Sequence, residues 1–237
     1  RIAVRSNIST QQLAQRLSEI DFGLISGRSE WSLSLDIPHS SADAAAVPAL
    51  LLSSDLKGVA VDLPAPFGKV AEQARNFVIG MEFPESASRS ITFQYGSLVN
   101  LVLSSQAEAG GGRKFTRGAL QLGGEPAKIP RAEGFEVGGR LKYLDLKAWA
   151  GLLQPEAGNS GALPLNRLKL KVERMTAGDF GLDDVSIDFQ REEAFLTGTV
   201  SSRQAEGSMQ IPEQILRQPL RIRLKRLSLN HSPGQQT

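Results

Sequence analysis

Alternation of apolar and polar residues recurs along most of this chain, and it constrains the fold more than any other feature. The clearest case is segment 167–173, where Leu168, Leu170 and Val172 alternate with charged residues. A period of two places these apolar side chains on one face of a β-strand and the charged ones on the other. A one-residue register shift would move the whole apolar set to the other face, so the pattern specifies strand pairing strongly.

The same alternation predicts strands along the rest of the sequence, at 30–37, 77–83, 91–95, 99–103, 135–143, 184–190 and 220–225. Residues 113–116 are strand-like as well. In the last segment the phase slips by one residue before Leu227 and Leu229, which predicts a β-bulge.

Helix signals are few and short. Ser9 has the properties of an N-cap with Gln12 at the capping-box position, followed by Leu13, Leu17 and Ile20 on one helix face. A second helix is expected from Asp145 to about Leu153, with Leu146, Trp149 and Leu153 at helical spacing. Such short helices cannot cover a large sheet. The expected fold is therefore all-β and mainly antiparallel, with a strongly twisted, curved sheet and two short helices.

Three stretches have loop composition: 40–47, the glycine-containing 107–114, and 154–164 with its prolines and glycines. We expect residues 1–237 to form one segment of a larger protein, with the best candidate for an internal boundary near 154–164. The chain begins at Arg1 and contains no run of about 18 apolar residues, so any anchor or targeting segment is expected to lie outside it.

Composition restricts the function. Apolar residues make up 41% and charged residues 22%, as in an ordinary folded domain. The formal charge of +2 gives no argument for a nucleic-acid partner. The chain has no cysteine, which excludes disulfides and thiol chemistry without choosing between cytoplasm and periplasm.

The residues that could carry chemistry do not form a catalytic pattern. His39 and His231 both fall in loop or tail sequence, and neither has the setting of a triad or zinc histidine. Several carboxylates cluster in the sequence, and we expect them to be solvated charges at turns or on the polar face of a strand. They are Asp179, Asp183, Asp184, Asp188, Glu192 and Glu193. The run Gly110–Gly112 is followed by a strand pattern rather than the helix that a phosphate-binding loop needs. We therefore expect no enzyme activity, no catalytic residue, no cofactor and no metal site.

The densest basic set is Arg217, Arg221, Arg223, Lys225 and Arg226. On a strand, Arg221, Arg223 and Lys225 share one face. A solvated outer face that discourages edge pairing explains this charge, and contact with anionic lipid headgroups or an acidic partner is the alternative.

The run from Ser53 to Lys69 has a distinctive order of residues. Val59, Val61 and Leu63 alternate with Gly58, Ala60 and Asp62, after which two prolines end the strand. Gly68 permits a tight bend, and Lys69 is expected to return the chain to water. The predicted structural corner consists of Pro64, Pro66, Gly68 and Lys69.

This run resembles a stretch in the late part of YhdP-like proteins, large envelope proteins related to AsmA. An S-x-L-x-G segment is followed there by an apolar strand and an L-P-x-P-x-G-K corner, matched here by Ser54, Leu56, Gly58, Leu63, Pro64, Pro66, Gly68 and Lys69. Segment 24–37, with Ser26, Gly27 and Trp31, and segment 134–149, with Asp145 and Trp149, are similar to the family as well.

The resemblance implies what the periodicity alone leaves open. The apolar faces could be covered by a second sheet, as in a sandwich, or by a ligand. YhdP-like and AsmA-like proteins form long apolar β-grooves and are implicated in phospholipid movement between the two membranes of bacteria. The resemblance thus implies a periplasmic, phospholipid-binding groove in an inner-membrane-anchored protein, connected to both membranes by parts outside this segment. Envelope-protein partners are a further expectation.

The residues predicted to line such a groove are those of the alternating segments. They are Trp31, Leu33, Leu35, Val59, Val61, Phe77, Ile79, Met81, Ile91, Phe93, Leu101, Leu103, Phe135, Val137, Leu141, Leu168, Leu170, Val172, Val185, Ile187, Phe189, Leu220, Ile222 and Leu224. Two other hypotheses stay open at this stage. One is a structural or adaptor β-sandwich that binds envelope proteins without lipid, and the other, a polysaccharide-acting enzyme, is poorly supported by two Trp and two Tyr.

Overall fold

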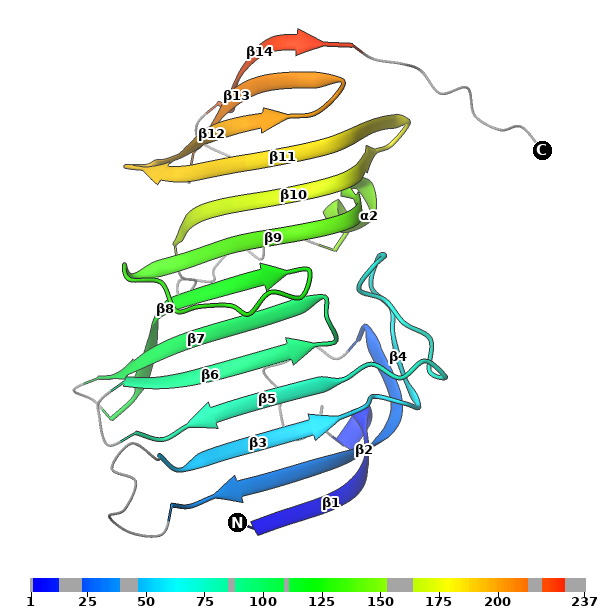
Figure 1. Ribbon diagram of the computed structural model, residues 1–237, viewed down its shortest axis with the longest axis vertical. Coiled ribbons are helices and arrows are strands. Elements are labelled where there is room, and N and C mark those ends of the chain that lie inside the picture. The colour runs from blue at the N-terminus through cyan, green and yellow to red at the C-terminus, as the bar shows by residue number, and fades with distance from the viewer. Residues whose placement is uncertain are drawn as a thin grey trace. The chain divides into compact units, whose positions relative to one another are not determined.

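The chain is an all-β protein with fourteen strands among the residues that the computed structural model describes (Figure 1). These residues are 2–12, 23–38, 47–84, 88–108, 111–152, 164–212 and 219–228. Most neighbouring strands pair antiparallel, and the strand order does not close on itself. The predicted all-β, mainly antiparallel fold class is therefore confirmed.

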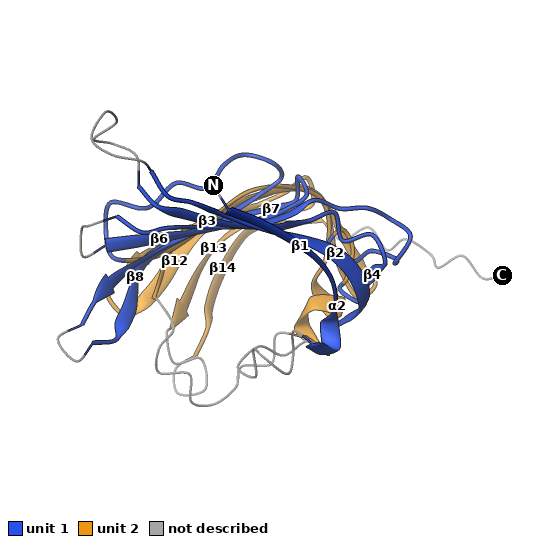
Figure 2. Ribbon diagram, turned by 90° about the horizontal axis from the view of Figure 1, so that it is seen from below, with its two compact units in different colours: residues 1–63, 67–133 blue, residues 64–66, 134–237 orange. Residues whose placement is uncertain are grey.

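The chain divides into two compact units, which are coloured separately in Figure 2. Unit 1 comprises residues 1–63 and 67–133, and unit 2 comprises residues 64–66 and 134–237. The boundary between the units thus falls after Glu133. Of the loop 154–164, only Pro164 belongs to the described part, so an internal boundary at that loop stays a prediction.

Unit 1 holds one antiparallel sheet in the order β1-β2-β3-β5-β6-β7-β8. The strands are β1 (Ile2–Ser9), β2 (Ile25–Asp36), β3 (Ala49–Ser54), β5 (Phe77–Glu82), β6 (Ser88–Tyr95), β7 (Val99–Ala107) and β8 (Arg113–Leu122). A short strand outside this order, β4 (Val59–Val61), pairs with the start of β2. Four predicted strands correspond to β2, β5, β6 and β7.

One face of this sheet is covered near β7 and β8 by segment 123–133. Asn100 and Arg117 donate side-chain hydrogen bonds to backbone carbonyls of this segment, at 3.0 and 3.4 Å. On the same face as these two residues, Val102 and Ala119 are cross-strand partners and are both buried. The segment therefore closes this part of one sheet face.

The predicted corner follows β4. Val61 and Lys69 exchange backbone hydrogen bonds of 2.9 and 3.0 Å, which fold the chain back on itself. Pro64 and Pro66 lie in the turn between them, outside every strand, as predicted. A Cβ on Gly68 would lie 2.2 Å from the Leu63 carbonyl oxygen, so this position requires glycine because of the close backbone approach.

The prediction that Lys69 returns the chain to water is wrong. Lys69 is 7% exposed, and its Nζ donates hydrogen bonds to the carbonyl oxygens of Leu56 (2.9 Å) and Val59. A buried ammonium is stabilised by hydrogen bonds, and these two carbonyls accept from two of its three N–H groups. Lys69 therefore acts inside the corner, where it ties two backbone segments together.

Unit 2 holds a sheet in the order β9-β10-β11-β12-β13-β14. Its elements are β9 (Gly134–Asp145), α2 (Leu146–Ala150), β10 (Leu165–Ala177), β11 (Phe180–Glu192), β12 (Phe195–Ser201), β13 (Ala205–Pro212) and β14 (Arg221–Leu227). The pair β9–β10 is parallel, and the other neighbours are antiparallel. A parallel pair needs a crossover connection, which here includes α2.

Both predicted helix starts are confirmed by their caps. Ser9 N donates to Gln12 Oε1 at 3.0 Å and Gln12 N donates to Ser9 Oγ at 3.3 Å, which is the predicted capping box. Asp145 caps α2 by accepting from Lys147 N and Ala148 N. Leu13, Leu17, Ile20 and Leu153, which complete the predicted helix faces, lie outside the described residues.

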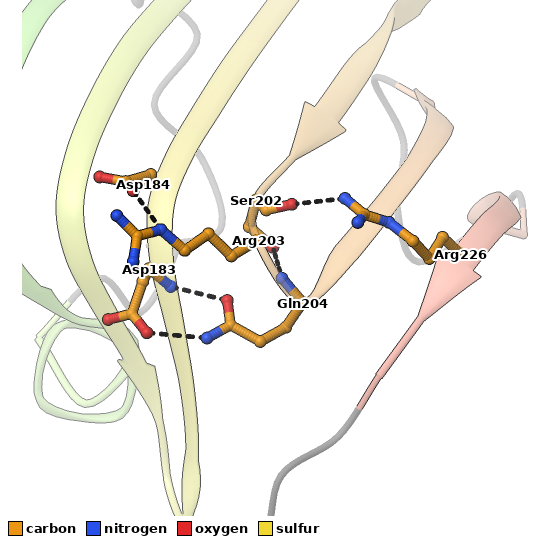
Figure 3. Close-up of polar contacts among 6 residues, drawn as sticks. All are labelled: Asp183, Asp184, Ser202, Arg203, Gln204 and Arg226. Carbon is orange, nitrogen blue, oxygen red and sulfur yellow. Dashed lines mark hydrogen bonds and ion pairs between the residues drawn. The ribbon is translucent and has the colours of Figure 1, made fainter.

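The predicted bulge lies in β14. The register between β13 and β14 shifts at Glu206/Gly207, which makes Lys225 the extra residue. Arg226 then donates to the Ser202 carbonyl at 2.9 Å, as Figure 3 shows. Leu229, the end of the predicted pattern, lies outside the described residues.

Two carboxylates of β11, Asp183 and Asp184, bind side chains of the turn between β12 and β13 (Figure 3). The Gln204 side chain accepts a hydrogen bond from Asp183 N at 2.9 Å and donates one to the Asp183 carboxylate at 2.8 Å. Arg203 pairs with Asp184 at 2.5 Å. These contacts fix the β12–β13 turn against β11, so the two carboxylates bind their own chain.

Candidate functional site

The most extensive chemical feature of unit 1 is one apolar face of its sheet. Two rows of direct cross-strand partners run over all seven strands, and every member is apolar or glycine. The first row is Val4, Leu33, Leu52, Ile79, Phe93, Leu101 and Leu120. The second is Ile2, Leu35, Leu50, Met81, Ile91, Leu103 and Gly118. We call these two rows the unit 1 apolar face.

This face keeps contact with solvent. Val4 is 58% exposed and Leu33 40%, and the row residues of β3, β5, β6 and β7 are half-buried. All described strands of unit 1 except β4 belong to the one sheet, so no second sheet of this unit faces the two rows. An ordinary β-sandwich would bury such rows against another sheet.

One end of the face is closed by the corner. Trp31, Leu56, Val59, Val61 and Tyr95 form a buried cluster there, against which Leu52, Phe77 and Phe93 pack. The Phe77 ring makes edge contacts with Trp31 and Phe93, with centroids 5.4 and 5.1 Å apart. The apolar rows therefore end in a packed aromatic core on this side.

Polar groups hold the corner cluster together. Arg75 donates to the Phe67 carbonyl at 2.8 Å and to the Tyr95 hydroxyl at 3.0 Å, and Tyr95 donates to the same carbonyl at 2.9 Å. Burial raises the pKa of Tyr95. Burial, and then the nearby Arg75 charge, lower the pKa of Lys69. Both shifts have burial as their largest cause, because burial disfavours the charged form of each group.

The opposite end of the face is basic. Arg89 on β6 continues the face beyond Ile91 and is the cross-strand partner of Ser105, which in turn is paired with Phe115. The Arg89 guanidinium lies 5.3 Å from the centre of the Phe83 ring. Arg113, on the same face of β8 as Phe115, donates to Ser105 Oγ at 3.1 Å. We call Arg89 and Arg113 the arginine pair.

Unit 2 carries a second apolar face. One row of cross-strand partners is Val137, Leu168, Phe189, Gly198, Met209 and Ile222, and the next is Gly139, Leu170, Ile187, Val200, Gly207 and Leu224. The six residues of β10 and β11 predicted to share one surface are direct partners: Leu168 with Phe189, Leu170 with Ile187, and Val172 with Val185.

Exposure changes along this second face. Val172 and Val185 are each 1% exposed, whereas Ile222 and Leu224 on β14 are 55% and 56% exposed. The helix α2 contacts β10. The face is therefore core-like at β10 and β11 and open towards β14.

The other face of unit 2 is polar and charged. Asp188 lies 3.8 Å from both Arg167 and Lys169, and all three side chains are close to half-exposed. Exposed ion pairs of this kind contribute little to stability. The sheet is thus two-faced, as the alternation predicts.

The predicted lining residues fall into three classes of exposure. The buried ones are Trp31, Val59, Val61, Leu141, Leu170, Val172, Val185 and Phe189. The half-buried ones are Leu35, Phe77, Ile79, Met81, Ile91, Phe93, Leu101, Leu103, Phe135, Val137, Leu168 and Ile187. The exposed ones are Leu33, Leu220, Ile222 and Leu224. Val59 and Val61 belong to the corner core and not to the two open rows.

Sequence reasoning missed several residues that complete the rows: Ile2, Val4, Leu50, Leu52, Leu120, Val200 and Met209. The alternation of Ile2 and Val4 was available as a signal. Leu50 and Leu52 were hidden in a continuous Leu50–Leu52 run, whose two faces the sequence cannot separate.

The described residues contain no group of three His, Asp or Glu that could hold a metal ion. His39 and His231 lie outside the described part. Beyond Gly111 and Gly112 the chain enters strand β8, so the glycine run does not lead into a helix. None of the helices described is long and apolar enough to cross a membrane.

Comparison with known proteins gives one positive result. No match was found among curated proteins or among solved structures. The sequence model of one family, described as "YhdP protein", matches residues 1–237, the whole chain. The corner motif, the two-faced strands and this match agree, and the chain belongs to the YhdP family of AsmA-like envelope proteins.

Proposed function

We propose that this chain is a segment of a periplasmic lipid-transfer protein whose sheet faces shield phospholipid acyl chains from water. The observation that carries the proposal is the unit 1 apolar face, where two rows of apolar residues and one glycine cross seven strands, and no second sheet among the described residues of unit 1 faces them. Membership of the YhdP family supports the envelope setting. In this proposal, parts of the protein outside the segment provide the inner-membrane anchor and the connection to the outer membrane.

The mechanism is passive solvation. Covering apolar surface with an acyl chain contributes about 25 cal/mol per Å², or about 0.8 kcal/mol for each CH₂ fully removed from water. Leu, Ile, Val and Met supply most of the rows, and these side chains offer no directional bonds that would fix one lipid position. The polar opposite faces keep the segment in water. No reaction and no proton transfer are needed.

A photocrosslinking amino acid placed at single positions in cells with two membranes tests the proposal. Positions 79, 93 and 101 lie on the unit 1 apolar face. Position 92 is the matched control, because Thr92 neighbours Phe93 on β6 but faces the other side and is exposed. We expect crosslinks to phospholipid at 79, 93 and 101 and none at 92.

The rival functions give different products in the same experiment. Crosslinks to an envelope protein at 79, 93 and 101, with no lipid, would identify the face as an adaptor surface. Crosslinks to one small molecule at a single position would favour an enzyme. Lipid mass spectrometry on extracts of the purified chain provides an independent readout, and absence of phospholipid in both experiments refutes the proposal.

A further inference from the structure

We infer that the arginine pair, Arg89 and Arg113, binds the phosphate of a phospholipid whose acyl chain lies along the unit 1 apolar face. The inference rests on the proposed function and deepens it, because it gives the lipid a fixed headgroup position within unit 1. The occupant is one glycerophospholipid molecule, recognised by its phosphodiester charge and by an apolar tail.

The first step is the position of the two guanidinium groups. Arg89 lies on the same face of the sheet as Ile91 and Leu103, one row beyond the last apolar row, and pairs there with Ser105 on β7. Arg113 pairs with Ala107 one row further on the same face, and its side chain reaches back to Ser105. The face therefore changes from aliphatic to cationic within two rows of residues, as an amphiphile changes between tail and headgroup.

The second step is that Arg113 is held in place. It donates from Nε to Ser105 Oγ at 3.1 Å and from Nη2 to the Ser105 carbonyl at 3.0 Å. Ser105 is 4% exposed, so the anchoring contacts are built into the sheet. The positive charge of Arg113 is thereby held at a defined place on the face, and a guanidinium is a group that phosphate binds well.

The third step is the aromatic surround. The Arg89 guanidinium lies over the Phe83 ring, and Phe115 lies on the same face beside Ser105. Phe115 is exposed. Arginine on aromatic rings at an apolar–polar boundary suits the region where the glycerol and first methylenes of a lipid lie.

The fourth step is charge. The Glu82 carboxylate accepts a hydrogen bond from Ser90 at 3.0 Å, on the face opposite to Arg89. Glu108 lies beyond the end of β7 and is exposed. Among the described residues of β5 to β8, the rim of the apolar face thus carries cationic and hydroxyl groups, which complements an anionic phosphate.

The fifth step is length. Arg89 and Tyr95 are six residues apart on β6 and point to the same face. At about 3.3 Å per residue they are about 20 Å apart, compared with about 15 Å for one leaflet of the bilayer's hydrocarbon core. Tyr95 belongs to the corner cluster that closes the far end. One acyl chain therefore fits between the arginine pair and the corner.

The test uses the purified 237-residue chain and mixed vesicles of dioleoyl-phosphatidylglycerol and dioleoylglycerol, which differ only in the phosphate-containing headgroup. Lipid carried by the protein is separated from the vesicles and quantified. We expect the natural chain to enrich phosphatidylglycerol, and the double variant Arg89→Gln, Arg113→Gln to lose about tenfold or more of that enrichment while still carrying dioleoylglycerol.

Lys114→Gln is the matched control, because Lys114 is exposed, is adjacent to Arg113 and faces the opposite side. It should leave the enrichment unchanged. Because Arg113 also donates hydrogen bonds to Ser105 within the sheet, its replacement could change stability as well as lipid binding. Arg89→Gln alone is therefore a second variant that keeps the Arg113–Ser105 hydrogen bonds, and it should lose part of the enrichment at unchanged thermal stability. Unchanged enrichment in both variants overturns the inference and leaves the proposed function standing. A natural chain that carries neither lipid refutes the proposed function and the inference together.

Discussion

Two adjacent residues of β7 test whether the unit 1 apolar face is open. Leu101 lies on that face and is half-buried, whereas Val102 lies on the opposite face, 6% exposed, in the part covered by segment 123–133. If the two-row face were an ordinary core, Leu101→Asp would be the more damaging substitution. If the face is open, Val102→Asp must be worse, although Val102 belongs to the face that is mainly polar elsewhere.

The structure gives the magnitudes. A half-buried leucine loses about 1 kcal/mol of burial when replaced, and aspartate adds up to about 1 kcal/mol of unfavourable strand propensity, so Leu101→Asp should cost about 1–2 kcal/mol. Val102→Asp loses about 1.5 kcal/mol of burial and buries an unpaired carboxylate at several kcal/mol, for a total of at least about 4 kcal/mol. The second cost approaches the whole stability of a domain.

Urea unfolding followed by tryptophan fluorescence measures both variants. The protein has two tryptophans, and a Trp149→Phe background leaves Trp31 of unit 1 as the reporter. The control is Gln106→Asp, which introduces the same charge at an exposed position of β7. Unfolding of Leu101→Asp at or below the urea midpoint of Val102→Asp would refute the open-face reasoning.

Three further predictions concern other parts of the chain. Gly198→Ala should destabilise unit 2 by several kcal/mol, because the new Cβ would lie 2.1 Å from the Asp188 carbonyl oxygen. Gly181→Ala is the control and should be nearly neutral, because its new Cβ would have no atom within 4 Å. Thermal unfolding compares the two variants, and equal effects contradict the packing argument. Burial lowers the pKa of Lys69 in the folded chain below its ordinary 10.5. The unfolded chain therefore keeps the Lys69 proton to higher pH than the folded chain, and the free energy of unfolding should rise as the pH increases towards 10.5. In urea titrations, Lys69→Met should lack the rise in the free energy of unfolding that the natural chain shows. An identical pH profile in the two proteins would exclude Lys69 as the source of the rise. Ile187→Asp should stop lipid crosslinking from a photocrosslinker at position 200, the cross-strand partner of Ile187, while leaving unit 1 crosslinks unchanged, and loss in both units points to general unfolding instead.

Strand positions were largely predictable, and the misses have physical causes. β12 and β13 escaped notice because Gly198 and Gly207 occupy apolar-face positions, which breaks the alternation. Neighbouring backbones approach these positions so closely that a side chain cannot fit, with carbonyl oxygens 2.1 and 2.7 Å from the ideal Cβ positions. The parallel pairing of β9 and β10 was not predicted, since alternation restricts the register of a pairing but not which strand is the partner or its direction.

The candidate site was predictable residue by residue only in part. Leu33, Ile79 and Leu101 could each be assigned to a strand face from sequence, but the row that joins them depends on pairings between distant segments. The arginine pair was missed for the same reason: Arg89 and Arg113 are far apart in sequence, and only the pairing of β6, β7 and β8 brings both to Ser105, Arg89 as its register partner and Arg113 through its side chain. The sequence search for basic residues found the β14 set instead, because that set is contiguous.

The motif that marks the family is structural. Ser54 Oγ donates to the Glu30 carbonyl at 2.7 Å and accepts from Leu56 N at 3.0 Å, and Gly58 lies where a Cβ would be 2.2 Å from the Arg28 carbonyl oxygen. Together with Lys69, these residues build the corner that closes one end of the unit 1 apolar face. Such a corner needs particular residues at particular places, whereas an aliphatic face accepts many combinations of Leu, Ile, Val and Met. The residues by which the sequence resembles the family therefore lie in the corner. The proposed lipid contact lies in the rows beside it, which carry no motif.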